Sequence, residues 1–270
     1  MQDRVTIDIT DGVADVRLVR PDKMNALDMA MFEALVAATE RLSREKGLRA
    51  VVLSGEGRAF CAGLDMGRFA AMKDGGGNGI PGGEKRDLTI RTHGQANFAQ
   101  QAVWGWRQLP VPVIAAVHGI AYGGGFQLAL GADMRYAAPD TKLSIMEVKW
   151  GLVPDMAGTP ILATLMRDDV LRELVYTGRV FSAEDGVSYG LVTRVCEDPR
   201  AAALDTAREI SAKNPDAIRA AKRMLNILSV DPGPALMAES IEQQKLIGSP
   251  NQLEAVRANM EKRAPRFVDV

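Results

Sequence analysis

The chain has 270 residues, of which 47% are hydrophobic and 25% charged, and its formal net charge is −1. This balance predicts a globular protein of one large or two unequal domains whose partner is a small molecule. No run of Lys and Arg exceeds two residues, so neither nucleic acid nor an anionic membrane surface is expected as a partner.

The rare residue types give no sign of a metal or redox centre. Cys61 and Cys196 lie far apart and belong to no metal-type cluster, and His93 and His118 lack a ligand at suitable spacing. We therefore predict neither disulfide nor metal, and structural roles for both histidines. No stretch of about 18 apolar residues occurs, which excludes an ordinary membrane span, and residues 1–12 carry charges where a signal peptide would be apolar. A cytoplasmic protein is expected.

The N-terminal segment predicts a hairpin followed by a helix. Residues 5–9 and 13–19 alternate apolar and polar side chains around a turn that contains Asp11 and Gly12. From Asp28, a plausible N-cap, apolar residues keep helical spacing to residue 46.

A glycine-rich loop follows the next predicted strand. Residues 50–53 form a short apolar strand that leads into the loop 54–65, where Asp65 could cap another helix. Residues 73–85 contain too much glycine for a packed element, so this stretch is either a lid over a site or a disordered loop.

The most informative stretch is residues 112–133. A predicted helix over residues 88–109 ends at Pro110 and Pro112, and an apolar strand then runs into a triple-glycine turn and a short apolar helix. Glycines at a helix start expose backbone N–H groups beside the positive end of the helix dipole. We therefore predict that this turn forms half of an oxyanion hole.

The remaining elements predict an α/β core followed by helices. Residues 134–137 and 142–145 read as strands, and the segment 146–155 leads through Gly158 into an apolar helix. From residue 168 helical patterns dominate, with one strand near residues 191–195. The change from alternating strands and helices to mainly helices starts between residues 177 and 214. We therefore divide the chain into a core, 1–195, and a helical C-terminal subdomain, 196–270.

Several common enzyme motifs are absent from the sequence. The glycine-rich stretch contains no G-x-G-x-x-G, no lysine follows a glycine loop as in a P-loop, and neither G-x-S-x-G nor H-E-x-x-H occurs. A nicotinamide dehydrogenase, a P-loop NTPase and two classes of hydrolase are therefore disfavoured.

Six motifs in order resemble one known family, the crotonase superfamily, also called the enoyl-CoA hydratase/isomerase family. They are residues 20–27 (RPDKMNAL), 57–65 (GRAFCAGLD), 116–127 (AVHGIAYGGGFQ), 131–133 (GAD), 151–154 (GLVP) and 261–267 (EKRAPRF). The resemblance covers nearly the whole chain. It implies a spiral core of strand-strand-helix (ββα) turns with a helical C-terminal trimerisation region, hence a homotrimer or a dimer of trimers.

The resemblance also implies the chemistry of the site. An acyl-CoA thioester would be held with its carbonyl oxygen between the backbone N–H groups of Leu64 and Gly124. Removing a proton beside a thioester gives an enolate, and preorganised donors contribute most where charge develops. Coenzyme A is part of the substrate, so no separate cofactor is expected.

The acid–base residues do not decide which reaction the protein catalyses. Hydratases of the family carry glutamates at the positions of Gln127 and Glu147, but Gln127 cannot exchange a proton at ordinary pH. Asp155 resembles an acid of the family's dienoyl-CoA isomerases. Other interpretations are that Glu147 is a surface residue and that Asp155 caps the helix 156–166.

Double-bond isomerisation by Glu147 and Asp155 is our first prediction. Hydration with Glu147 as the sole base is the second, and a non-catalytic acyl-CoA-binding protein is the third. By the same resemblance, Lys23, Ala26, Ala62 and Leu64 would border the CoA moiety. Lys262 of a neighbouring subunit would meet a phosphate.

Overall fold

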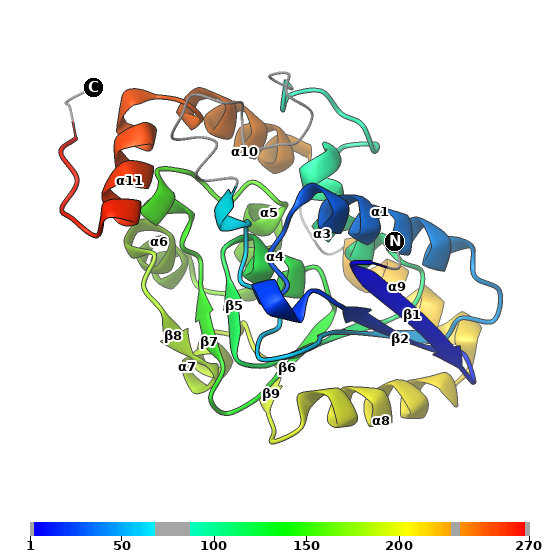
Figure 1. Cartoon of the computed structure of the whole chain (residues 1–270). Helices are drawn as coiled ribbons and strands as arrows, with labels where there is room; N and C mark the ends of the chain where they lie inside the picture. The colour runs from blue at the N-terminus through cyan, green and yellow to red at the C-terminus, as the bar shows by residue number, and fades with distance from the viewer. Residues whose placement is uncertain (1–2, 68–86, 228–232, 268–270) are drawn as a thin grey trace.

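The computed structural model describes residues 3–67, 87–227 and 233–267 (Figure 1). The glycine-rich stretch 73–85, predicted as a lid or a disordered loop, lies outside these residues. Within the described ranges, no helix combines the length and the apolar character that crossing a membrane requires.

A six-stranded sheet forms the centre of the fold. Its first strand is antiparallel to the second, and all other neighbours are parallel. The middle strands are buried along nearly their whole length, as expected for a parallel sheet with both faces covered. In spatial order the strands are β1 (Val5–Thr10), β2 (Val13–Leu18), β3 (Ala50–Gly55), β4 (Val113–Val117), β6 (Met134–Ala137) and β9 (Arg194–Val195).

The predicted hairpin is confirmed. Thr10 of β1 pairs with Val13 of β2, which leaves Asp11 and Gly12 as a two-residue turn. Both turn residues have positive φ, 51° and 78°, as a tight hairpin connection with the twist of the strands requires.

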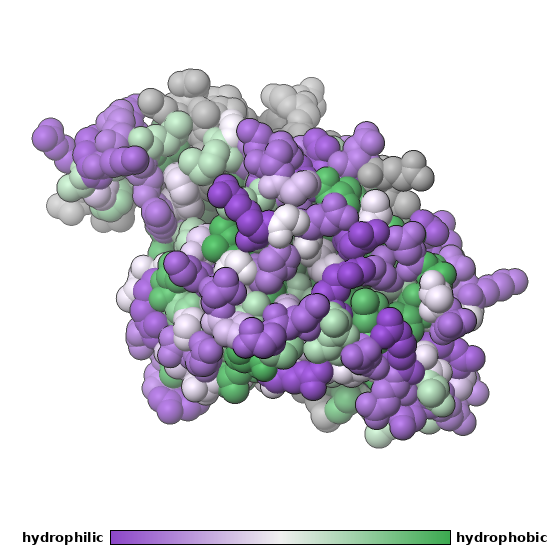
Figure 2. All heavy atoms as spheres, turned by 60° about the horizontal axis from the view of Figure 1, so that its bottom comes forward, coloured by the Kyte–Doolittle hydropathy of each residue, from purple (hydrophilic) through white to green (hydrophobic). Residues whose placement is uncertain are grey.

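Helices cover the two faces of the sheet. On one face lie α1 (Met29–Arg44) and α3 (Phe98–Gln108), and on the other lies α8 (Pro199–Ser211) (Figure 1). The side chains of Ala203 and Ala207 on α8 pack in one cluster with strand residues. The surface on this side of the molecule is mostly hydrophilic, with hydrophobic side chains in small groups (Figure 2). The predicted boundary at residue 196 stays a prediction, although α8 follows it and still covers the sheet.

The predicted helix over residues 88–109 is wrong in its first part. Helix α3 begins only after Asn97, whose side chain accepts a hydrogen bond from the N–H of Gln100 while the Gln100 side chain accepts one from the N–H of Asn97. This capping box satisfies N–H groups at the helix start. Before this helix, Gly94 has a φ of 62°, so the predicted helix cannot run through this residue.

The single strand predicted after Pro112 is two strands in different sheets. β4 ends at Val117, and β5 (Ile120–Tyr122) joins a second sheet with β7 (Lys142–Ser144) and β8 (Phe181–Ser182). Gly119 lies between them with a φ of 62°, and a Cβ there would lie 2.1 Å from the Arg58 carbonyl oxygen. This close approach explains why glycine occupies the corner.

From residue 168 the described chain is mainly helical, as predicted, with only the two-residue strands β8 and β9. Helix α4 (Gly124–Leu130) begins within the triple glycine 123–125, and α10 (Gly233–Leu246) and α11 (Pro250–Glu261) lie beside the segment that carries Glu147 and Asp155 (Figure 1). The other α-helices of the described residues are α5 (Gly158–Leu165), α6 (Asp168–Thr177), α7 (Ala183–Ser188) and α9 (Pro215–Ile227).

Candidate active site

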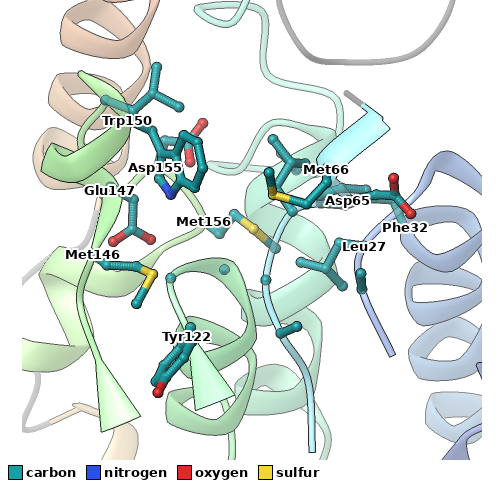
Figure 3. A pocket seen from close by; sticks show the side chains of 18 of the residues that line it. Leu27, Phe32, Asp65, Met66, Tyr122, Met146, Glu147, Trp150, Asp155 and Met156 are labelled. Atoms are coloured by element: carbon teal, nitrogen blue, oxygen red, sulfur yellow. The ribbon is translucent and has the colours of Figure 1, made fainter. Parts of the chain in front are cut away.

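A cavity of about 690 Å³ opens where the two glycine loops, the loop after β7 and helix α10 meet (Figure 3). Most of its wall is apolar. Four acidic residues line it: Asp22 and Asp65, of which Asp65 pairs with Arg20 at 2.6 Å, and Glu147 and Asp155, which we call the two cavity carboxyl groups. The apolar side chains labelled in Figure 3 include Leu27, Phe32, Met66, Met146, Trp150 and Met156.

The first glycine loop leaves one of its backbone N–H groups, that of Leu64, unpaired with the neighbouring segment at Leu27. The Leu27 N–H donates to the Gly63 carbonyl at 2.8 Å, and the Asp65 N–H donates to the Leu27 carbonyl at 3.2 Å. Because alternate residues of an extended segment face opposite sides, the Leu64 N–H points away from Leu27.

The second glycine loop lies against the first. Cys61 exchanges hydrogen bonds with the β5 segment, donating to the Ile120 carbonyl and accepting from the Tyr122 N–H, each at 3.2 Å. Gly63 has a φ of 88°, and a Cβ there would lie 2.5 Å from the Tyr122 carbonyl oxygen and 3.7 Å from the Gly124 nitrogen. Only glycine allows the two segments to come this close.

The N–H groups of Leu64 and Gly124 donate no backbone hydrogen bond within the described residues. Gly124 is the first residue of α4, where an N–H has no partner inside the helix. Gly123 before it has a φ of 50° and a ψ of −123°, a conformation that is essentially restricted to glycine. Both N–H groups are therefore without a backbone acceptor, as an oxyanion hole requires, and their predicted role as its two donors stays a prediction.

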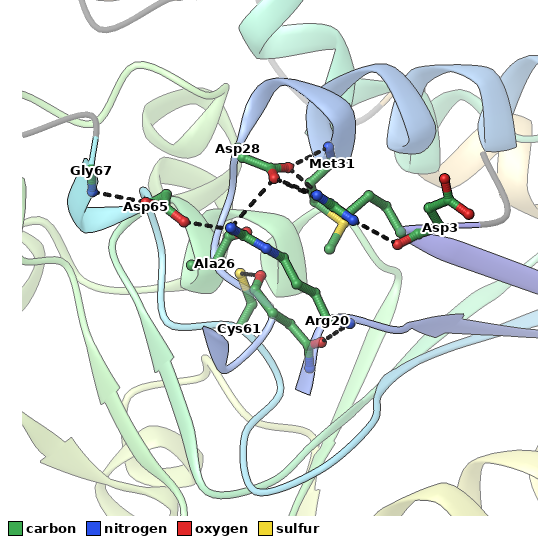
Figure 4. A network of polar contacts seen from close by, with 10 residues as sticks. Asp3, Arg20, Ala26, Asp28, Met31, Cys61, Asp65 and Gly67 are labelled. Carbon is green, nitrogen blue, oxygen red and sulfur yellow. Dashed lines mark hydrogen bonds and ion pairs between the residues drawn. The ribbon is translucent and has the colours of Figure 1, made fainter. Parts of the chain in front are cut away.

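A charged network supports the first loop (Figure 4). Arg20 donates to the Asp65 carboxylate at 2.6 Å and to the Ala26 carbonyl at 3.0 Å, and lies 3.5 Å from Asp28, which also binds Arg4. Burial alone raises the pKa of Asp65, but hydrogen bonds from the Gly67 N–H and from Arg20 outweigh it and lower that pKa. Arg20 thus joins the two segments that carry Ala26 and Leu64.

Glu147 is a buried carboxyl group, 8% exposed, at the start of the 3₁₀ helix Glu147–Trp150. The alternative that it is a surface residue is wrong. Gln127 donates its Nε2–H to Glu147 Oε1 at 2.6 Å, whereas the buried Oε2 has no hydrogen-bond partner among the described residues. Burial raises the pKa of Glu147 to about 7, against the opposing effect of the Gln127 hydrogen bond.

Asp155 lies on the same cavity, in the loop before α5. It does not cap that helix: α5 begins at Gly158 after Ala157, and no side chain of its own N-cap residue accepts a hydrogen bond. Burial raises the pKa of Asp155 to about 8, and the charges of Glu239 and Glu147 raise it further. Burial thus brings both pKa values near neutral, so each of the two cavity carboxyl groups can gain or lose a proton there.

Two residues of α10 belong to this region but were not predicted. Glu239 is 4% exposed and binds the loop that follows Asp155, and the Gln243 side chain accepts from the Val153 N–H at 3.1 Å. They are four residues apart and so share one face of the helix. That spacing is the only sequence signal for them, because their partners lie far away in the chain.

The residues predicted to border CoA divide into two groups. Lys23, Ala26 and Ala62 line the cavity together with Leu64, and the Lys23 side chain is exposed. Lys262 is the exposed residue that follows α11 and does not line the cavity of its own chain. Its predicted role, contributed by a neighbouring subunit, stays a prediction.

Comparison with known proteins places the chain in a family. Residues 8–270 match the family described as enoyl-CoA hydratase/isomerase. The chain belongs to this family. Enoyl-CoA hydratases/isomerases are enzymes of the crotonase superfamily that act on acyl-CoA substrates, and the predicted family is thus confirmed.

Two curated relatives and one solved structure illustrate the similarity. The chain is 30% identical to mouse mitochondrial methylglutaconyl-CoA hydratase over 264 residues, covering 95% of this chain and 79% of that protein. It is 34% identical to human mitochondrial Delta(3,5)-Delta(2,4)-dienoyl-CoA isomerase over 217 residues, covering 78% of this chain and 64% of that protein.

The fold agrees with this family. An enoyl-CoA hydratase/isomerase from Mycobacterium paratuberculosis superposes with a TM-score of 0.83 at 26% identity, over 95% of this chain and 98% of the other. The predicted crotonase-like α/β fold with a helical C-terminal region is therefore confirmed.

Proposed function

We propose that the protein is an enoyl-CoA isomerase, which moves a carbon–carbon double bond along the acyl chain of a CoA thioester. The observation that carries the proposal is that Glu147 and Asp155 line one cavity together with the N–H groups of Leu64 and Gly124. Position 127, where a second hydratase acid would stand, holds a Gln.

Isomerisation needs one group that accepts a proton and one that donates a proton, and two carboxyl groups can fill these two roles. One carboxylate removes a proton from the carbon beside the thioester carbonyl, and the electrons move onto the carbonyl oxygen as an enolate. The Leu64 and Gly124 N–H groups stabilise that oxygen. The other carboxyl group then returns a proton farther along the chain. With pKa values of about 7 for Glu147 and about 8 for Asp155, the pair commonly holds one proton near neutral pH.

The similarity to a dienoyl-CoA isomerase supports this proposal, and the similarity to a hydratase supports a second candidate. In that candidate Glu147 acts alone, its unpartnered Oε2 accepting a proton from a water molecule that adds to the double bond. The third possibility is a protein that binds acyl-CoA without turning it over.

The test compares three substrates with the purified protein: a 2-enoyl-CoA, a 3-enoyl-CoA and a 3,5-dienoyl-CoA. Isomerisation leaves the product mass unchanged in H₂O and introduces deuterium in D₂O, whereas hydration adds the mass of one water. We expect isomerisation of a 3-enoyl or a 3,5-dienoyl substrate, and its loss in Glu147→Gln and in Asp155→Asn. Rapid water addition without isomerisation would favour the hydratase, and binding without exchange would favour the third possibility.

We also propose that the chain assembles as a homotrimer or a dimer of trimers. Met224 and Leu225 on α9 are 68% and 64% exposed, which is unusual for neighbouring large apolar side chains. Light scattering of the purified protein measures the assembly directly. A monomer at working concentration would contradict both the assembly and the phosphate contact of Lys262.

A further inference from the structure

Gln127 connects Glu147 to the segment that follows Asp155, and it uses both polar atoms of its side-chain amide to do so. Its Oε1 accepts from the N–H groups of Met156 at 2.9 Å and Gly158 at 3.0 Å. These donors fix which end of the amide is oxygen, so the Nε2–H must face Glu147, 2.6 Å away. Gln127 is 1% exposed.

Glu239 binds the same segment from the opposite side. Its Oε2 accepts from the Ala157 N–H at 2.9 Å and from Gln100 Nε2 at 2.9 Å. Its Oε1 accepts from Thr159 twice, from the backbone N–H at 2.9 Å and from the hydroxyl at 2.6 Å. Four donors thus hold both oxygens of a carboxyl group that is almost fully buried.

The four successive N–H groups of residues 156–159 are therefore accepted alternately by Gln127 and Glu239. This segment starts α5 without a capping side chain of its own, and Ala157 has a φ of 65°, an unfavourable conformation for alanine. Such a conformation persists only where surrounding contacts impose it. Asp155 immediately precedes the segment, so the same contacts fix where its backbone lies.

We propose that Glu239 of α10 is a positioning residue for the reaction, which holds Asp155 at the cavity through residues 156–159. Nothing in the sequence motifs or in the comparisons assigns this residue a role. The inference rests on the proposed function for its effect on catalysis, but its effect on Asp155 itself can be measured separately.

The charges around Glu239 support an electrostatic effect. Asp155 and Glu147 lie close enough for the charge of Glu239 to act on them, Arg91 also interacts with that charge, and Gln100 of α3 donates a hydrogen bond to it. Burial raises the pKa of Glu239, and Glu239 in turn raises the pKa of Asp155 and of Glu147. Removing its charge is therefore expected to lower the pKa of Asp155.

The main test compares Glu239→Gln with Glu242→Gln, the same substitution at an exposed position of the same helix. Carbon-13 NMR of carboxyl-labelled aspartate, with Asp155→Asn to assign the signal, measures the titration of Asp155 in each. We expect a lower titration midpoint in Glu239→Gln and none of this shift in Glu242→Gln. This measurement does not depend on which reaction the enzyme catalyses.

Steady-state kinetics provide the second readout. Misplacing a reacting group by about 1 Å costs about 100-fold in rate, so we expect kcat to fall by about 10- to 100-fold in Glu239→Gln. KM should change little, because the residues predicted to border CoA lie elsewhere. If Asp155→Asn keeps full isomerase activity, the proposed function is wrong, and the NMR result still decides the inference.

Two milder substitutions, both of Thr159, serve as the test if Glu239→Gln does not fold. Thr159→Val removes the hydroxyl that donates to Glu239 and keeps the shape, whereas Thr159→Ser keeps the hydroxyl. We expect Thr159→Val to shift the Asp155 titration and lower kcat, and Thr159→Ser to restore both. Wild-type titration and kcat in folded Glu239→Gln, or in Thr159→Val if the first variant is unfolded, would overturn the inference.

Discussion

Gln127 illustrates how one residue constrains both reaction and structure. Its side chain cannot donate a proton to substrate as a carboxylic acid can, and its amide is held by Met156, Gly158 and Glu147. The hydrogen bond to Oε1 of Glu147 leaves the second oxygen of that carboxylate without a protein partner among the described residues. In the proposed reaction, the Glu147 atom that would transfer the proton is therefore Oε2.

Replacing Gln127 with Leu is expected to destabilise the fold. The N–H groups of Met156 and Gly158 lose their acceptor, and each unsatisfied buried group costs about 1–3 kcal/mol. We therefore expect the free energy of unfolding to fall by about 2–6 kcal/mol, measured by urea denaturation. Gln127→Glu keeps an acceptor and should lose less stability. Equal losses in the two variants would contradict this account.

The two cavity carboxyl groups predict the pH dependence of isomerisation. The proposed isomerisation needs one ionised and one protonated group, so kcat/KM should rise as the pH approaches about 7 and fall above about 8. The apparent pKa values from the rise and from the fall belong to the pair of carboxyl groups and not to either residue alone, because the two groups interact. A profile measured on a 3-enoyl-CoA tests this, and a flat profile across this range would argue against proton transfer by the pair.

Among the elements, the two glycine loops show why spacing alone could predict part of the site. Motifs at residues 57–65 and 116–127 predicted two strand-to-helix turns, and the structure brings them into contact through Cys61 and β5. The sequence did not predict the corner at Gly119, because an unbroken apolar run gives no sign that the chain changes sheets there. Likewise, the helical pattern before Asn97 is overridden by the capping box that begins α3.

Gly63→Ala tests the contact between these loops. Gly63 and Gly47 have similar φ values, 88° and 78°, but a Cβ at Gly63 meets the Tyr122 carbonyl oxygen at 2.5 Å, whereas one at Gly47 meets nothing within 4 Å. The positive φ alone costs about 1–2 kcal/mol in each variant. We expect Gly63→Ala to lose clearly more stability in thermal unfolding than Gly47→Ala. A similar loss in both would show that the close approach is unimportant.

At the scale of the molecule, buried acids make stability depend on pH. Asp155 has a pKa of about 8 in the folded protein and an ordinary value of 3.8, so between these values the folded state binds a proton that the unfolded state lacks. Stability from this group is therefore fully present below about pH 4 and is lost as the pH rises through about 8. Asn does not titrate, so it avoids this loss.

We accordingly expect Asp155→Asn to gain stability relative to the wild type between about pH 5 and about pH 9. Urea unfolding midpoints at both pH values measure the change. Asp140→Asn, at an exposed turn, is the matched control. If the difference between Asp155→Asn and the wild type is the same at both pH values, Asp155 does not hold a proton in the folded protein.

Long-range contacts set the limit of what the sequence could predict. The family, the fold and most helices and strands followed from motifs and periodicity, and Glu147 and Asp155 were named because they stand at recognisable positions. Glu239 and Gln243 carry no motif and act only because the fold packs α10 against the loop 152–159. Residues of this kind become visible only when the tertiary contacts are known.

The donor pair at the glycine loops has one further consequence, for hydrogen exchange. Leu64 and Gly124 lie in well-packed segments, yet their N–H groups donate to no backbone acceptor in the described parts of the chain. In the free protein these two amides should exchange with deuterium faster than their hydrogen-bonded neighbours Cys61 and Tyr122. A bound thioester carbonyl would slow both together, so paired protection would report formation of the oxyanion contact without any turnover.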